Sequence, residues 1–357
     1  MLPLFRPHPL FRGGHAQTLA GCYLPGLTIV ERATRHCVEL ADNDRIVLHE
    51  DEPNSHALEN GCRHNRDKIA LLVHGLGGSH RSGYLQRCTH KLTTRGIRVF
   101  RMDLRGCGAG VGLARYPVHA GRSQDVGAAL EFILRRYDEA SVCVVGFSMG
   151  ANLILKLLGE WGDLAPRRLI AAMAVAPPID LLECSRSLND GLGWLYDRAF
   201  LTGLVRAAAT RRRHVPDGHH LPPAARPRRL LDFDETFTAP VGGFAGAEDY
   251  YQRASAGPLL AQIRVPTMIV TAADDPIIPV GPFERANYSP QTKLVITPSG
   301  GHLGFVGVSK VDPDRRWLDW RILEWIEGLE AATAGESTRV ETAAAEQPAA
   351  ALNQRVA

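Results

Sequence analysis

Short apolar runs alternate with helical patterns along most of the chain. The runs are bounded by turn-forming residues, as is typical of strands buried in a sheet. Residues 123–137, 152–159 and about 315–329 instead carry apolar side chains at helical spacing. The expected strands are two within 36–50, around the turn Asp42-Asn43-Asp44, and one each at 69–73, 97–102, 142–145, 169–175, 267–271 and 293–297.

Strands that alternate with helices predict an α/β protein, with a mostly parallel central sheet and helices on both faces. Residues 1–35 show neither pattern and are expected to be irregular. The alternation also stops at about 178–258, where we expect a mostly helical insertion over the C-terminal edge of the sheet. Residues 333–357 are rich in Ala and Glu and predict a disordered tail. One domain over 1–332, with 178–258 as its cap, is the expected organisation.

Composition adds limits to this picture. Hydrophobic residues make up 45% of the 357 residues, as in an ordinary globular protein. The net charge of +3 is too small to favour nucleic acid or an acidic membrane surface as a partner. The chain has seven cysteines, an odd number, and none forms a Cys-x-x-Cys pair. A disulfide framework or zinc site is therefore not expected. We also expect no signal peptide, no membrane-spanning segment and a cytoplasmic location.

One motif lies between an apolar strand and a helix, namely Gly146-Phe147-Ser148-Met149-Gly150. Glycines on both sides permit a tight turn that raises the Ser148 hydroxyl above the sheet, beside the N-terminus of the helix. Such glycine spacing also occurs by chance in simple turns. The strand before the motif and the helix after it favour a nucleophile.

A serine nucleophile needs a basic partner, and the base needs an acid to orient it. His302 follows the strand 293–297 and two glycines. Asp274 and Asp275 follow the strand 267–271, so the chain order is serine, acid, histidine. Both acids remain open. We favour Asp275 because of its spacing from Pro266 and Pro279, while Asp274 is suited to capping the turn.

The same chemistry needs N–H donors for a developing oxyanion. The backbone N–H groups of Met149 and Leu76 are expected to supply them, because Leu76 lies in a glycine-rich turn after the strand 69–73. No metal and no organic cofactor is expected.

These residues resemble the α/β-hydrolase superfamily and, more narrowly, its YheT-like branch, which includes the mammalian α/β-hydrolase-domain proteins 1 and 3. The resemblance covers about residues 6–330. It implies a serine hydrolase acting on carboxylic esters, in some relatives lipid acyl esters. Ala151 replaces a glycine common in the branch, and Gly13-Gly14 departs from its usual N-terminal segment. The matching motifs are His15-Ala16-Gln17-Thr18, His74-Gly75-Leu76-Gly77-Gly78-Ser79, Leu104-Arg105-Gly106-Cys107-Gly108, Gly146-Phe147-Ser148-Met149-Gly150-Ala151-Asn152, Asp274-Asp275-Pro276 and Gly300-Gly301-His302-Leu303-Gly304-Phe305.

Several features admit a second interpretation. Arg105 fits a structural turn near the floor of the site or a substrate contact. The arginines of 211–213, with Arg226, Arg228 and Arg229, fit a solvated face of the cap, or attraction to lipid headgroups. A serine–histidine–acid set also serves acyltransferases, and a hydrolase fold without turnover serves as a binding module. Hydrolysis of a small-molecule ester is the favoured function, and a lipid ester is one candidate substrate.

Overall fold

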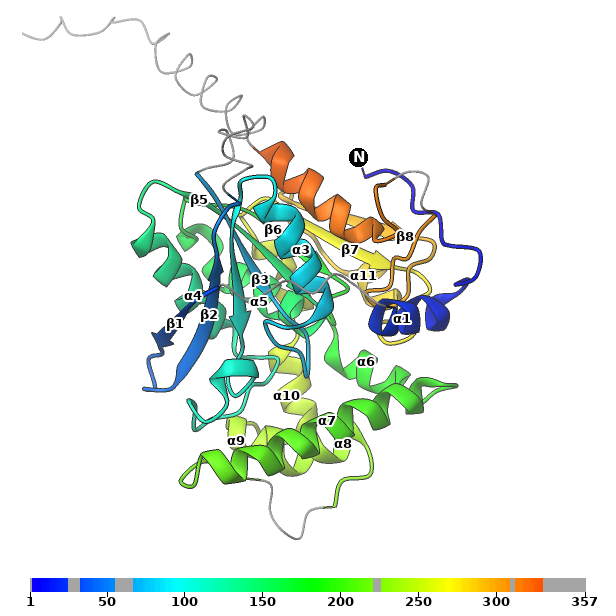
Figure 1. The fold of residues 1–357 in the computed structure, drawn as a ribbon. Helices are drawn as coiled ribbons and strands as arrows, with labels where there is room; N and C mark the ends of the chain where they lie inside the picture. Colours follow the sequence, from blue (N-terminus) through cyan, green and yellow to red (C-terminus); the bar gives the residue numbers. More distant parts are fainter. Residues whose placement is uncertain (1, 25–32, 55–66, 221–225, 309–311, 330–357) are drawn as a thin grey trace, which may run out of the picture.

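The computed structural model describes residues 2–24, 33–54, 67–220, 226–308 and 312–329. Within these ranges eight strands form one sheet, and each lies at or within a few residues of an expected strand (Figure 1). The strands are β1 (Thr34–Glu39), β2 (Arg45–Asp51), β3 (Lys68–Val73), β4 (Arg98–Asp103), β5 (Ser141–Phe147), β6 (Leu169–Val175), β7 (Thr267–Ala272) and β8 (Thr292–Thr297).

The strand order is β1-β2-β4-β3-β5-β6-β7-β8. The pairs β1–β2 and β2–β4 are antiparallel, and every pairing from β4 across to β8 is parallel. This confirms the mostly parallel sheet. The carboxyl ends of the parallel strands therefore meet at one edge, which is where open α/β sheets place their sites.

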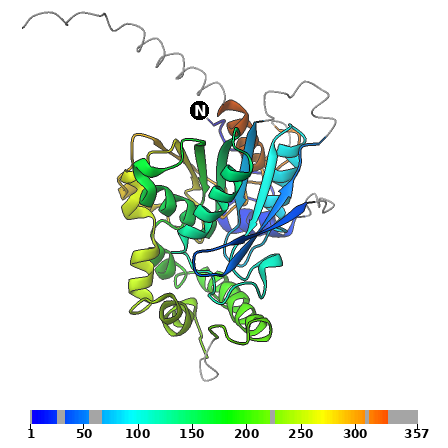
Figure 2. The ribbon, with the colours of Figure 1, turned by 90° about the vertical axis from the view of Figure 1, so that its left-hand side faces the viewer.

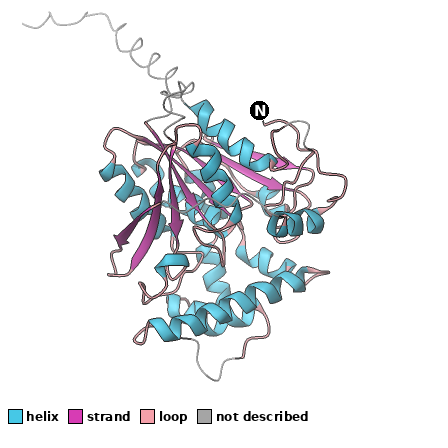
Figure 3. Ribbon diagram, viewed as in Figure 1, coloured by secondary structure: helices cyan, strands magenta, loops and turns pink. Residues whose placement is uncertain are grey.

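Helices cover both faces of the sheet, as predicted (Figure 3). On β3, Ile69 and Leu71 pack into one core with α4 (Ser123–Arg136) and α5 (Met149–Trp161). Leu72 points the opposite way, into a second core with α3 (Gly83–Thr93) and the helix formed by residues 317–329. A strand buried on both faces is apolar throughout, which explains the short apolar runs.

Three helices of the described residues outside the cap interval were not expected, and one of them is the short α11 (Gly281–Arg285) between β7 and β8. Residues 14–23, predicted to be irregular, form α1 (Gly14–Tyr23), and α3 fills the connection between β3 and β4. The prediction for 1–35 is wrong at α1 because the buried side of this helix is partly polar. Gln17 and Thr18 are among its buried residues, so no apolar stripe marks it.

The described residues between β6 and β7 are largely helical, and their helices lie at one end of the molecule (Figures 1 and 2). We call residues 181–254 the cap. They occupy the interval for which the insertion at 178–258 is expected, and they contain a small apolar cluster around Leu201, Phe233 and Phe237. The segments are α6 (Leu181–Ser187), α7 (Gly193–His214), α8 (Leu230–Phe233), the π-helical turn η4 (Asp234–Thr238), α9 (Ala239–Gly242) and α10 (Ala247–Ala254).

Two further expectations concern membrane-spanning helices and the C-terminal tail. Of the helices in the described ranges, none combines the length and the apolar character needed to span a bilayer. The tail predicted at 333–357 lies outside the described residues.

Asn152 joins α5 to two neighbouring segments. Its side-chain amide is fully buried, donates to the carbonyl oxygens of Ala120 and Ala254, and accepts from the N–H of Ala256. We expect Asn152→Ala to lower the free energy of unfolding by about 3 kcal/mol or more, because buried groups left without partners cost about 1–3 kcal/mol each. Urea denaturation measures it. The exposed Gln252→Ala is the control, and equal stability of the two variants would contradict the assigned role.

Candidate active site

Ser148 lies between β5 and α5 with a left-handed backbone, φ 52° and ψ −122°. Its N–H donates to the carbonyl of Val175 at 2.8 Å. Gly150 allows α5 to pass close to β3, because a methyl group there would lie 2.5 Å from the oxygen of His74 and 2.6 Å from that of Val73. The glycine spacing thus permits a turn that exposes the Ser148 hydroxyl at the carboxyl edge of the sheet.

Three polar side chains from separate loops form one hydrogen-bonded chain at this edge. His302 Nε2 lies 3.0 Å from Ser148 Oγ, and His302 Nδ1 lies 2.9 Å from Asp275 Oδ2. The other carboxylate oxygen of Asp275 accepts the N–H groups of Ile277 and Ile278 at 2.8 and 3.0 Å. Asp275 is therefore fixed by the backbone on one side and faces the imidazole on the other.

Asp274 contacts the same loop without reaching the imidazole. Its Oδ1 accepts the backbone N–H of Gly301 at 2.9 Å. The two acids left open by the sequence thus lie in different places: Asp275 beside the ring of His302, and Asp274 beside the backbone that precedes it.

Helix α1 supports the loops that carry this chain. Thr18 Oγ1 accepts the N–H of His302 at 2.9 Å, and the Gln17 side-chain amide both donates to and accepts from the backbone of Val306. Gly14 packs directly on the backbone of Asp274, since a methyl group at Gly14 would lie 1.6 Å from the backbone carbonyl oxygen of Asp274. Sequence reasoning placed Gln17 and Thr18 in a family motif but assigned them no role. His15, also in that motif, stacks on Tyr196 of the cap and lies 2.9 Å from its hydroxyl.

The two expected oxyanion donors border the same space as Ser148. Leu76 and Met149 both line a pocket that also contains Ser148. Met149 is the first residue of α5, and N–H groups of the first helical turn have no partner within the helix. Leu76 and Met149 therefore border the space beside Ser148.

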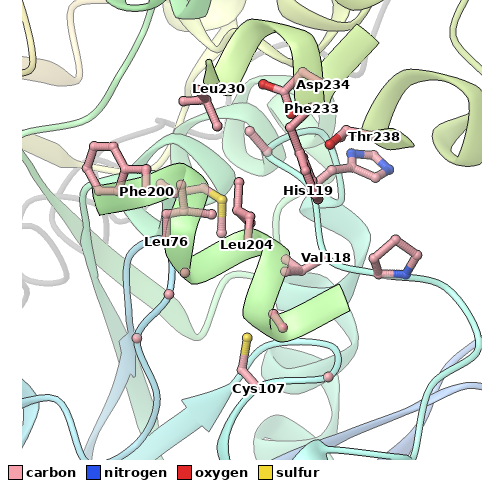
Figure 4. Close-up of a pocket in the computed structure, with 18 of the residues that line it drawn as sticks. Leu76, Cys107, Val118, His119, Phe200, Leu204, Leu230, Phe233, Asp234 and Thr238 are labelled. Carbon is pink, nitrogen blue, oxygen red and sulfur yellow. The ribbon is translucent and has the colours of Figure 1, made fainter. Parts of the chain in front are cut away.

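The pocket has a volume of about 410 Å³ and lies between the sheet edge and the cap. In Figure 4, Leu76 and Phe200 lie on one side, His119 and Thr238 on the other, and Cys107 opposite Leu230. Most of the lining is apolar, including Phe200, Leu204, Phe233 and Phe237. Such a chamber suits an apolar chain better than a charged ligand.

Burial shifts the pKa of three titratable groups in this lining toward their uncharged forms. Burial raises the pKa of the Cys107 thiol to about 12, so it does not supply a thiolate near neutral pH. Burial, aided by nearby arginines, lowers the pKa of His119 to about 3, which keeps the imidazole neutral. Burial also raises the pKa of Asp234 to about 6, although the Tyr251 hydroxyl donates to its carboxylate at 2.7 Å.

Arg105 is a structural residue in this arrangement. Its guanidinium is buried and bonds to both oxygens of Asp125, to Asp42 and to Asp44. These carboxylates satisfy its charge, which favours the structural interpretation over a substrate contact.

Arg211 departs from the expected solvated face. It is buried and donates to the carbonyl oxygens of Ala114 and His219. Its neighbours Arg212 and Arg213 are exposed, as are Arg226, Arg228 and Arg229. The run of three arginines does not itself distinguish Arg211 from its neighbours, because the phase of the helix decides which side chain points inward.

A cluster of His49, His80 and Asp103 places three ligand-type atoms within 4.8 Å of one another. Both imidazoles lie within hydrogen-bond distance of Asp103 Oδ2, at 3.0 and 2.7 Å, and that oxygen also accepts the N–H of Ala109. The Asp103 carboxylate thereby connects β2, the loop after β3 and the segment after β4 that contains Ala109. Hydrogen bonding accounts for this geometry.

The chain belongs to the alpha/beta hydrolase fold family, whose model matches residues 70–307. It is 32% identical to the putative esterase YheT of Escherichia coli K12, over 75% of this chain and 79% of that protein. It is 29% identical to human phospholipase ABHD3, over 66% of this chain and 58% of that protein. These relatives confirm the YheT-like resemblance. The Pyrococcus furiosus esterase Pf2001 shares the fold, with a TM-score of 0.53 and 16% identity over 92% of this chain and 98% of that one.

The buried carboxyl of Asp234 generates a pH-dependent prediction. Its folded pKa, about 6, lies above the usual value of about 3.9, so folding favours the protonated form. The ionised form is destabilising, and this cost grows as pH rises from about 4 through 6. We expect Asp234→Asn to raise unfolding free energy at pH 8 by about 2–3 kcal/mol, and by progressively less toward pH 4. Urea denaturation across this range measures it; a pH-independent difference would contradict it.

Proposed function

We propose that this protein is a serine hydrolase that cleaves carboxylic esters through Ser148, His302 and Asp275. The hydrogen-bonded chain from Ser148 Oγ through both ring nitrogens of His302 to Asp275 carries the assignment. Membership of the hydrolase fold family and the esterase and phospholipase names of relatives support it.

In the first half of the proposed reaction, Ser148 Oγ attacks the ester carbonyl while His302 Nε2 takes the hydroxyl proton. Asp275 accepts the Nδ1–H and stabilises the imidazolium. The N–H groups of Leu76 and Met149 bind the oxyanion. The tetrahedral intermediate collapses with release of the alcohol, which receives the proton from His302, and the acyl group remains on Ser148.

In the second half, His302 removes a proton from water, which attacks the acyl carbon. The bond to Ser148 Oγ then breaks, and the proton returns to Ser148 as the carboxylic acid leaves. The largely apolar pocket of about 410 Å³ beside Ser148 favours an apolar acyl chain as part of the substrate.

Ser148→Ala is the first test of this function. Across p-nitrophenyl esters from acetyl to palmitoyl, we expect turnover by the wild type and a loss on the order of 10⁴-fold or more in the variant, because the nucleophile is removed. The preferred chain length reports the depth of the pocket. No wild-type turnover of any ester, together with no fluorophosphonate labelling of Ser148, would contradict the proposal.

The adjacent acids provide a matched pair for the second test. We expect Asp275→Asn to lower kcat on the order of 10⁴-fold, because an amide at this position disfavours the Nδ1–H tautomer that His302 needs. Asp274→Asn keeps the imidazole's partner, and its loss should remain within about tenfold. Steady-state kinetics of the two variants decide the assignment, and a larger loss in Asp274→Asn would transfer the acid's role to Asp274.

A further inference from the structure

Positive charge is concentrated in the first half of the cap. Residues 193–233 contain eight arginines and three aspartates, with no Lys or Glu, and so sum to +5. The whole chain is only +3, which leaves −2 for all its other residues. The small net charge therefore hides a strongly basic segment, and this segment lies at one end of the molecule (Figures 1 and 2).

Helix α7 has an apolar side that faces the pocket and an exposed side that carries arginines. Phe200, Leu204 and Ala208 line the pocket from its inner side. On the outer side, exposed residues recur at intervals of three or four, which places them along one stripe of the helix. The members of this outer stripe are Leu195, Arg198, Thr202, Arg206, Ala209 and Arg213.

The three arginines of the outer stripe are available to an external partner. Arg198, Arg206 and Arg213 are exposed, and none of them is ion-paired with a carboxylate in the described part of the chain. At 1.5 Å per residue they extend over about 22 Å, and the stripe contains no acidic residue. A row of like charges without counterions favours an extended anionic surface over a small ligand.

Large apolar side chains are exposed at the beginning of the same helix. Leu192, Trp194 and Leu195 are 52%, 54% and 47% exposed. Apolar and aromatic groups next to arginines are the composition of helices that lie in a membrane interface, where the apolar groups enter the lipid and the cations contact headgroups. Nucleic acid would match the charge but offers no apolar layer to these side chains.

We propose that the outer stripe of α7, with Leu192 and Trp194, docks on an anionic lipid surface. Docking there would bring the pocket, whose wall is the inner side of the same helix, next to the lipid. This goes beyond ester cleavage, and its test requires no turnover.

The test is co-sedimentation of full-length Ser148→Ala protein with phosphatidylcholine vesicles, with and without phosphatidylglycerol. We expect tighter binding to the anionic vesicles, weakened by salt. The triple variant Arg198→Gln, Arg206→Gln, Arg213→Gln should lower the partition coefficient about a hundredfold, since each arginine near such a surface contributes roughly fivefold. Trp194→Ala should weaken binding without any change in charge.

A control variant removes the same charge elsewhere: Arg35→Gln, Arg135→Gln, Arg167→Gln, at exposed positions outside the cap. It should bind the anionic vesicles to within about twofold of the parent. Circular dichroism melts establish that each variant is folded. Equal losses in the two triple variants, no preference for anionic vesicles, or tighter binding to duplex DNA than to those vesicles would each overturn the proposal. None of these outcomes bears on esterase activity.

Discussion

The backbone of Ser148 is the constraint on which the rest of the site depends. A non-glycine residue at φ 52° and ψ −122° carries strain of about 1–3 kcal/mol and persists only where its surroundings enforce it. Here β5 and α5 enforce it from both sides, and the close approach of α5 to β3 at Gly150 leaves no room for relaxation. The hydroxyl is thereby held at the sheet edge. The loops that carry Asp275 and His302 then have only to place their side chains in line with it.

Those loops are fixed by a helix far away in the sequence. Thr18 and Gln17 of α1 bond to the backbone of the His302 loop, and Gly14 packs against Asp274. The backbone oxygen of Asp274 lies so close to Gly14 that position 14 admits no side chain without a shift of the loop. The N-terminal segment therefore belongs to the architecture of the site, although it precedes the sheet and lies outside the family match at 70–307.

Sequence patterns predicted what is repeated and local. Strands buried on both faces are apolar throughout, and the turn at Ser148 has its own glycine signature, so both could be found without a structure. Three features could not be predicted in this way: the polar inward side of α1, the sharing of the Asp103 carboxylate by two imidazoles, and the burial of Arg211. Each depends on a hydrogen-bond partner more than 20 residues away in the chain, and a single sequence does not show which distant residues come into contact. Asp274 and Asp275 differ by one position, and only the direction of each side chain separates them.

The net charge of the chain likewise does not reveal where its charged side chains lie in the fold. A net charge of +3 is too small to favour anionic partners, but a sum over the chain says nothing about where charges lie. Folding assigns Arg211 to the interior and leaves Arg198, Arg206 and Arg213 along the outside of one helix. Because α7 is both a wall of the pocket and a basic outer surface, whatever contacts that surface lies within one helix diameter, about 10 Å, of the pocket.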